Sequence, residues 1–343
     1  MGWCVRTVYI VTETSTPTAA DATDETGNQP TSDAATVLAA VRRLTPLIVT
    51  RSDEIERGRR LPLDLVARLR SAGCFRMLVP HRLGGAEADL TEHLQLLREL
   101  ATADGSVGWT VMIGSSAPMI LGRLPTASFD GVYADGPDVV VAGTFNPTGV
   151  ATIVDGGFRT SGRWAFASGC EHADWFVAHC MVDDGSVPPL RMMVVPATEV
   201  DIVDTWTVAG LCGTGSHDFA LDNVFVPAAR TFSVFEPGGL EGAMGRIPEL
   251  QYSSLAIAAV AVGIADGALA DITTLATAKV PMFSDGTLAA NPLFRHQLAE
   301  ADAERRAARA LLDSEVATTW QIAMSADEFT PERRAGFEPP RHG

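Results

Sequence analysis

The spacing of apolar residues changes twice along this chain of 343 residues, and these changes limit the folds open to it. In the first third, residues such as Val37, Leu38 and Val41 recur at helical spacing, which predicts amphipathic helices. From Val139 the pattern becomes an alternation rich in Val, Phe, Thr and Trp, which predicts strands. Helical spacing returns at Tyr252. The sequence therefore predicts a helical front, a β-domain in the middle and a helical back.

Together with a polar start, these changes divide the chain into four parts. Residues 1–33 are mostly Thr, Ala, Asp, Pro and Gly, so they bury too little to offset the entropy of ordering, and we expect a disordered tail. An N-terminal helical domain is expected at 34–125 and a central antiparallel β-sandwich or barrel at 126–236. The remainder, 237–343, is expected to be a C-terminal helical bundle that is incomplete. The predicted fold class is multi-domain α+β.

Individual elements can be predicted within these parts. Helices are expected from Ala34, from Leu61 to Gly73, over 90–103 and from Val107 to about Leu121, with a short extended run at 75–80. Seven strands are expected between residues 139 and 225. Two long helices follow at about 252–278 and 292–324, and Thr330 begins what resembles another.

The helix at 252–278 is apolar on every side. A helix of this kind is buried in a bundle or in an oligomer core. With only half a bundle to cover it, its surface is expected to pair with another subunit. The sequence therefore predicts a homo-oligomer, a dimer or a tetramer.

Charge and composition exclude several classes of protein. The formal net charge is −16 at pH 7, which repels phosphate backbones, so nucleic acid is not expected as a partner. The five cysteines contain no Cys-x-x-Cys pair, so we expect reduced thiols and no metal site. No stretch is expected to approach the roughly 20 apolar residues of a membrane span, and the first residues do not fit a signal peptide. A cytoplasmic location without a membrane partner is expected.

The strongest local signal lies between Gly162 and Trp175. In a regular strand, Trp164, Phe166 and Ser168 share one face. That face offers two flat apolar walls and a hydroxyl, an arrangement that suits a flavin ring and its N5 edge. The same face could instead simply pack the core of a sandwich, which spacing alone favours, and both interpretations stay open.

Two other features are weaker. The string from Gly210 to Ser216 resembles a phosphate-binding loop, but a strand-like stretch follows where a dinucleotide fold starts a helix, so we reject that interpretation. His172 beside Glu171 could carry a proton or bind a metal, yet no second ligand falls at the required spacing. A histidine in a surface loop is the expectation.

Six strings in this order resemble those of the acyl-CoA dehydrogenase superfamily over about residues 34–324. Within it, the chain is most similar to the two-component flavin-dependent monooxygenases that hydroxylate phenols and steroid rings. The strings are Arg59–Pro62, Arg76–Pro80, Gly84–Gly85, Asp104–Trp109, Trp164–Trp175 and Gly210–Asn223.

The departures from the dehydrogenases favour the same branch. Acyl-CoA dehydrogenases proper carry Thr-Glu-Pro and Gly-Ser-Asp over the flavin, where this chain has Phe145-Asn146-Pro147 and Val150-Ala151-Thr152. They also tend to carry an Arg-x-x-Phe-Gly string that grips the FAD pyrophosphate, which the region 283–294 lacks. Tight retention of FAD is therefore not expected.

The resemblance implies a site and a reaction. Reduced FMN or FAD from a separate flavin reductase would react with dioxygen to a C4a-hydroperoxyflavin, which would hydroxylate a phenolic or steroid-derived aromatic substrate. Ser168 would hydrogen-bond near N5 and is the one catalytic residue implied. The flavin would be lined by Trp109, Phe145, Asn146, Trp164, Phe166 and Ser168.

The catalytic base is not assigned. The family keeps its base in the last helices of a back bundle of four, and this chain is expected to have room for only two of them and the beginning of a third. Two alternatives therefore stay open: an acyl-CoA dehydrogenase that oxidises an acyl-CoA thioester with FAD, and an impaired paralogue that serves as an oligomer partner.

Overall fold

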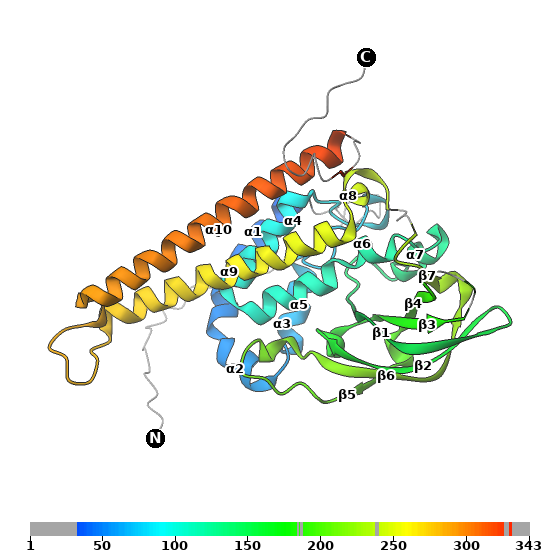
Figure 1. Cartoon of the computed structure of the whole chain (residues 1–343), viewed down its shortest axis with the longest axis horizontal. Coiled ribbons are helices and arrows are strands. Elements are labelled where there is room, and N and C mark those ends of the chain that lie inside the picture. The colour runs from blue at the N-terminus through cyan, green and yellow to red at the C-terminus, as the bar shows by residue number, and fades with distance from the viewer. Residues whose placement is uncertain (1–32, 184, 186–187, 237–239, 326–328, 331–343) are drawn as a thin grey trace, which may run out of the picture. The chain divides into compact units, whose positions relative to one another are not determined.

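The computed structural model describes residues 33–183, 185, 188–236, 240–325 and 329–330. The expected tail, apart from Asp33, and the helix expected to follow Thr330 lie outside these residues. The front of the described chain is helical (Figure 1). Its helices are α1 (Ala34–Thr50), α2 (Ser52–Gly58), α3 (Leu63–Ser71), α4 (Leu90–Ala103), α5 (Gly105–Ser115), α6 (Ala117–Leu121) and α7 (Thr126–Val132).

Aspartates mark the starts of three of these helices. The side chain of Asp33 accepts from the Thr36 N–H at 2.7 Å, and Asp104 accepts from the first turn of α5. Asp89 and Glu92 form a reciprocal capping box on α4. The start of α1 and both ends of α4 fall where the sequence predicted them. The short helix α2, which buries only Ile55 among its residues, was not predicted.

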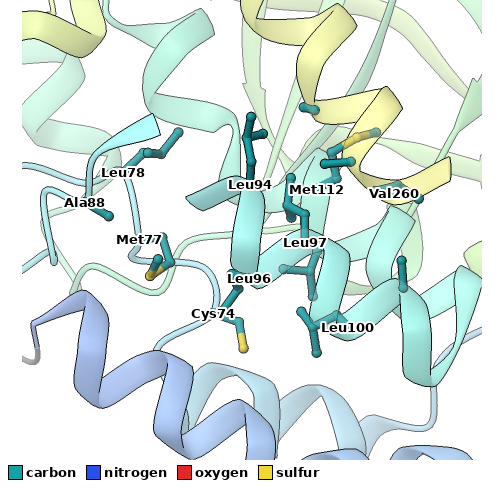
Figure 2. Close-up of a cluster of buried hydrophobic side chains, with 14 of the residues drawn as sticks. Cys74, Met77, Leu78, Ala88, Leu94, Leu96, Leu97, Leu100, Met112 and Val260 are labelled. Carbon is teal, nitrogen blue, oxygen red and sulfur yellow. The ribbon is translucent and has the colours of Figure 1, made fainter. Parts of the chain in front are cut away.

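Residues 75–80 form turns instead of the predicted extended strand. Their carbonyls are paired locally, because Ala86 donates to Arg76 at 3.0 Å and Ala88 donates to Met77 at 2.8 Å. The apolar character of this run comes from its place in the core. Figure 2 shows Cys74, Met77 and Leu78 in one buried cluster with leucines of α4.

The middle of the chain forms one seven-stranded sheet in the order β5-β6-β2-β1-β3-β4-β7. Residues 126–132 are helical, so the sheet begins later than the predicted β-domain. The prediction of an antiparallel domain is wrong for one pair, since β1 and β3 are parallel. The strands are β1 (Val141–Val154), β2 (Gly157–Ala167), β3 (Trp175–Val182), β4 (Leu190–Pro196), β5 (Asp201–Val203), β6 (His217–Pro227) and β7 (Thr231–Phe232).

The sheet curls strongly around a core of its own. Phe176 on β3 lies 5.0 Å from Phe219 on β6, although β2 and β1 separate these strands in the sheet order. Trp164 stacks on Phe219 at 4.9 Å and lies across Gly149, where a Cβ atom would come within 2.0 Å of the indole. Glycine at position 149 is therefore required by the packing of this tryptophan.

The back of the chain consists of α8 (Gly242–Arg246), α9 (Glu249–Ala278) and α10 (Pro292–Ser325). Helix α9 packs against α4 and α5, and α10 runs beside α9 (Figure 1). An ion pair of 2.6 Å between Arg305 and Asp266 joins the two long helices. Both long helices were predicted from the sequence.

Helix α9 corrects one expectation. By length and composition alone it could cross a membrane, contrary to the prediction that no stretch would qualify. Its first half packs as a bundle helix, with Leu255, Ala259 and Val262 buried. In the second half, among the described residues after Gly263, only Ala276 is buried, and Leu275 is 52% exposed. An apolar face of α9 is therefore left open.

Candidate active site

A bulge in β2 separates the residues that alternation would have placed together. The pairing of β2 with β6 shifts between Trp164 and Ala167, and Phe166 adopts the left-handed conformation with φ 68°. The prediction that Trp164, Phe166 and Ser168 share one face is therefore wrong. Phe166 is 70% exposed, whereas Trp164 is fully buried. Trp164 packs the sheet core, which is the alternative that the spacing left open.

A second bulge lies in β1. Its pairing with β3 shifts between Thr144 and Gly149, and this leaves Phe145 and Asn146 exposed. The Nδ1 atom of His179 lies 2.7 Å from the carbonyl oxygen of Phe145. Because a carbonyl can only accept, Nδ1 of His179 carries the hydrogen. His179 therefore anchors the backbone of the β1 bulge through this hydrogen bond.

The two bulges are neighbours across the β1–β2 pair. The antiparallel register joins Val150 to Ser161, and Gly162 packs directly against the backbone of Gly149. The hydroxyl of Thr148, within the β1 bulge, donates to the carbonyl of Arg163, just before the β2 bulge, at 2.8 Å. Two exposed aromatic rings are therefore brought to the same end of two adjacent strands.

A third aromatic residue, Trp206, belongs to this surface. Its ring meets that of Phe166 edge-on, with centroids 6.2 Å apart. The loop that carries Trp206 is held firmly, because Arg59 donates to the Trp206 carbonyl at 2.7 Å and also pairs with Asp204. His217 accepts the N–H of Trp206 at 3.1 Å. The aromatic surface is thus fixed from both strands and from this loop.

Behind the aromatic surface runs a chain of buried hydroxyl groups. Trp109 Nε1 donates to Ser168 Oγ at 3.0 Å, and Ser168 Oγ lies 2.7 Å from Ser216 Oγ. Ser216 Oγ lies 2.7 Å from Thr214 Oγ1, which donates to the Leu211 carbonyl at 2.9 Å. The three hydroxyl residues are buried and Trp109 is half-buried. This chain joins α5 to the end of β2.

Sequence reasoning missed Thr214, Ser216, Trp206 and His179. The string from Gly210 to Ser216 was noticed and its resemblance to a phosphate loop was rejected, but its hydroxyls were not assigned to the site; it forms a short 3-10 turn over Cys212–Thr214. It brings two hydroxyls, those of Ser216 and Thr214, into the hydrogen-bonded chain that begins at Ser168. No local pattern links these residues to Trp109, which lies about a hundred positions earlier in the chain.

His172 differs from the prediction of a surface histidine. It is buried, and neither ring nitrogen has a hydrogen-bond partner in the described structure. Burial lowers the pKa of His172 below its usual value, so the ring is neutral near pH 7. The neighbouring Glu171 is engaged by Arg60 at 3.0 Å. Neither residue is presented as a base to the aromatic surface.

The residues present fit a flavin ring. Exposed aromatic rings at Phe145 and Phe166 provide a stacking surface, and Ser168 provides a hydroxyl. Two buried polar atoms have no partner among the described residues: Thr110 Oγ1, in a residue next to Gly169, and His179 Nε2, in the ring that bonds the Phe145 carbonyl. Buried polar atoms of this kind are usually satisfied by a bound group or by water. Among the described residues, no group of three or more His, Cys, Asp or Glu could hold a metal ion.

Comparison with known families agrees with this geometry. The family model described as acyl-CoA dehydrogenase, N-terminal domain, matches residues 31–125, and the model of the C-terminal domain matches residues 255–338. The crystal structure of the HsaA monooxygenase from M. tuberculosis superposes with a TM-score of 0.80 at 30% identity. That match covers 89% of this chain and 81% of the other.

Curated relatives point to one branch of the family. An indole-3-acetate monooxygenase of Acinetobacter baumannii is 36% identical over 272 residues, which span 79% of this chain and 70% of the relative. The oxygenase component of an FADH2-dependent resorcinol hydroxylase from Rhizobium sp. is 32% identical, over 81% of this chain and 72% of that protein. The chain therefore belongs to the acyl-CoA dehydrogenase superfamily, within the flavin-dependent monooxygenases. The resemblance, the enzyme class and the flavin dependence predicted from the sequence are confirmed.

Proposed function

We propose that this protein is the oxygenase component of a two-component system that hydroxylates an electron-rich aromatic compound, phenolic or steroid-derived. The observation that carries this proposal is the pair of bulges that exposes Phe145 and Phe166 beside the buried hydroxyl of Ser168. Dioxygen is the second substrate. Reduced FMN or FAD, delivered by a separate flavin reductase, supplies the chemistry that activates the oxygen.

The chain's own residues would bind and orient the flavin. Phe166 and Phe145 offer stacking faces, and the exposed side chain of Asn146 offers an amide at the rim of the ring. Ser168 would meet the N5 edge, held there by the indole N–H of Trp109. Trp164 supports this arrangement from the core and makes no direct contact in our proposal.

The aromatic surface also favours hydroxylation of the substrate over the loss of oxygen as hydrogen peroxide. The bound flavin would supply activated oxygen, which would be wasted as hydrogen peroxide if water and stray proton donors could reach it. Phe145, Phe166 and Trp206 present carbon surface, and the hydroxyls behind them are engaged with one another. With a flavin bound over it, a surface of this composition would offer few proton donors besides one positioned hydroxyl.

The experiment that tests the function follows the oxygen atom. The purified protein is mixed with a flavin reductase, NADH, FMN or FAD and a panel of phenols and indoles under 18O2. We expect one labelled oxygen in a hydroxylated product, detected by mass spectrometry. Hydrogen peroxide as the only product with every aromatic compound would contradict the proposal and would favour an impaired paralogue.

The dehydrogenase alternative has its own signature. A dehydrogenase would retain oxidised FAD through purification, and its yellow colour would bleach on addition of an acyl-CoA without oxygen. We expect neither result, because the Glu-Pro and Gly-Ser-Asp elements of dehydrogenases are replaced by Phe145–Pro147 and Val150–Thr152.

We also propose that the protein acts in the cytoplasm as a dimer or tetramer. The support is the apolar face of α9, where Ile257, Ile264 and Leu275 are exposed. Exposed apolar area of this kind on a helix is usually covered by another subunit. Sedimentation analysis of the wild type and of Ile264→Glu tests this. We expect a smaller particle for the variant, and a monomeric wild type would contradict the proposal.

A further inference from the structure

The chain of hydroxyl groups between Trp109 and Leu211 has as many hydrogens to donate as it has hydrogen bonds. It has four links, from Trp109 Nε1 to Ser168, Ser216, Thr214 and finally the Leu211 carbonyl. The available hydrogens are the indole N–H and one from each of the three hydroxyls. Since the indole can only donate and the carbonyl can only accept, all four links form together only when every hydroxyl points the same way. In that state Ser168 donates to Ser216, and Ser216 donates to Thr214.

This polarity leaves Ser168 with nothing to donate outward. Its hydrogen is directed at Ser216 and one lone pair receives the Trp109 N–H, so one lone pair remains. Burial strengthens the preference, because an unbonded hydroxyl in this dry position is costly. Toward a ligand, Ser168 is therefore an acceptor.

We propose that Ser216 and Thr214 are positioning residues that hold Ser168 as an acceptor and thereby make the site select reduced over oxidised flavin. The inference rests on the proposed function, in which the N5 edge of the flavin meets Ser168. Oxidised flavin has no hydrogen on N5 and can only accept there, whereas reduced flavin carries an N5–H and donates. An acceptor at Ser168 pairs with the reduced form and leaves the oxidised form unpaired.

The preference is finite because the chain can reverse. The Leu211 carbonyl also receives the Trp206 indole N–H at 3.2 Å and the Thr214 N–H at 3.1 Å. If Thr214 turned its hydrogen to Ser216, this carbonyl would stay bonded and Ser168 would become a donor. Reversal sacrifices one hydrogen bond of four, which corresponds to a selectivity of about tenfold.

The test compares affinities for the two redox states of one flavin. Dissociation constants for oxidised and photoreduced FMN are measured, the latter without oxygen, and their ratio is the readout. Ser216→Ala removes the acceptor for the Ser168 hydrogen. Thr214→Val, which is nearly isosteric, lets Ser216 donate to Ser168 instead. Thr160→Val is the matched control, because its buried hydroxyl has no partner in the described structure.

We expect the ratio to fall about three- to tenfold in Ser216→Ala and Thr214→Val, mainly through tighter binding of oxidised FMN. The control should stay within about twofold of the wild type. If Ser216→Ala fails to fold, Thr214→Val decides the matter. Unchanged ratios in folded variants would overturn the inference and leave the proposed function standing. A wild type that binds neither redox state would instead overturn the proposed function, and this inference with it.

A second measurement reads the chain without flavin. The indole N–H of Trp109 gives its own signal in a 1H–15N spectrum, identified by its loss in Trp109→Phe. In the reversed chain Ser168 accepts from Ser216 as well as from Trp109, so the Trp109 signal should move in Thr214→Val and stay fixed in Thr160→Val. An unchanged Trp109 signal in Thr214→Val would contradict the claim that the directions of these hydroxyls are coupled.

Discussion

The indole N–H of Trp164 donates to the backbone carbonyl of His179 at 2.8 Å and so joins β2 to β3 over the intervening strand β1. With its ring stacked on Phe219, Trp164 is a central residue of the curled sheet. Its neighbour two positions later, Phe166, faces outward. The two residues therefore serve different purposes, and substitutions can separate them.

Trp164→Phe should destabilise the fold. The change leaves the His179 carbonyl without this donor and opens space against Gly149, at a cost of about 2–4 kcal/mol in the free energy of unfolding. Urea denaturation measures it. The affinity of the folded variant for reduced flavin should stay within about twofold, and a large loss of affinity with unchanged stability would show that Trp164 contacts the flavin after all.

Phe166→Ala should behave in the opposite way. Because the ring is 70% exposed, the free energy of unfolding should change by less than about 0.5 kcal/mol. Loss of the stacking face should weaken the binding of reduced flavin about tenfold, measured by anaerobic titration. Phe166→Gly is the companion variant. It removes the same ring but suits the left-handed backbone, so it should be at least as stable as Phe166→Ala.

His179 should support the β1 bulge, and with it flavin binding, through its hydrogen bond to the Phe145 carbonyl. Asparagine can place its amide N–H where Nδ1 lies, whereas leucine has the same shape and no donor. We expect His179→Leu to speed deuterium exchange in the peptide 143–150 and to weaken flavin binding, and His179→Asn to retain both properties. Equal behaviour of the two variants would mean that His179 acts only by filling space.

Stability should fall in acid because of His93. This fully buried ring contacts Ser115 Oγ at 2.9 Å and Tyr252 Oη at 3.2 Å, and burial lowers the pKa of His93 from 6.5 to about 3. Below pH 6.5 the unfolded chain takes up a proton that the folded chain excludes. The stabilisation of the fold by neutral His93 is fully present above pH 6.5 and is lost as the pH falls toward 3.

The loss from this one group should reach about 2 kcal/mol by pH 5. Urea denaturation of the wild type and of His93→Gln at pH 7 and pH 5 measures it. The glutamine variant should lose less stability between these two values than the wild type. An equal loss in both proteins would show that other groups govern the acid response.

Helices were predictable because their information is local. The capping aspartates and the repeated leucines of α4 lie within one segment of sequence, and the segment folds as they indicate. The run at 75–80 was mispredicted because burial, and not strand pairing, accounts for its apolar residues. Its carbonyls accept hydrogen bonds from the N–H groups of residues 86–88, and no periodicity in the sequence predicts this pairing.

The site was only partly predictable. Phe145, Asn146, Phe166 and Ser168 were predicted as flavin contacts from their strings, but the bulges that set their directions depend on the register of four strands, β1 with β3 and β2 with β6. A non-glycine residue in the left-handed region, as at Phe166, gives no signal in the sequence. The hydroxyl chain draws on α5, β2 and the turn before β6, so only the fold could bring it together.

The most direct test of the central claim is an anaerobic titration of the purified protein with photoreduced FMN and FAD, followed by the change in flavin fluorescence. We predict saturable binding of the reduced form at about micromolar concentration, weaker binding of the oxidised form, and a marked loss of affinity in Phe166→Ala. No binding of reduced flavin, or equal binding by the wild type and Phe166→Ala, would contradict the account.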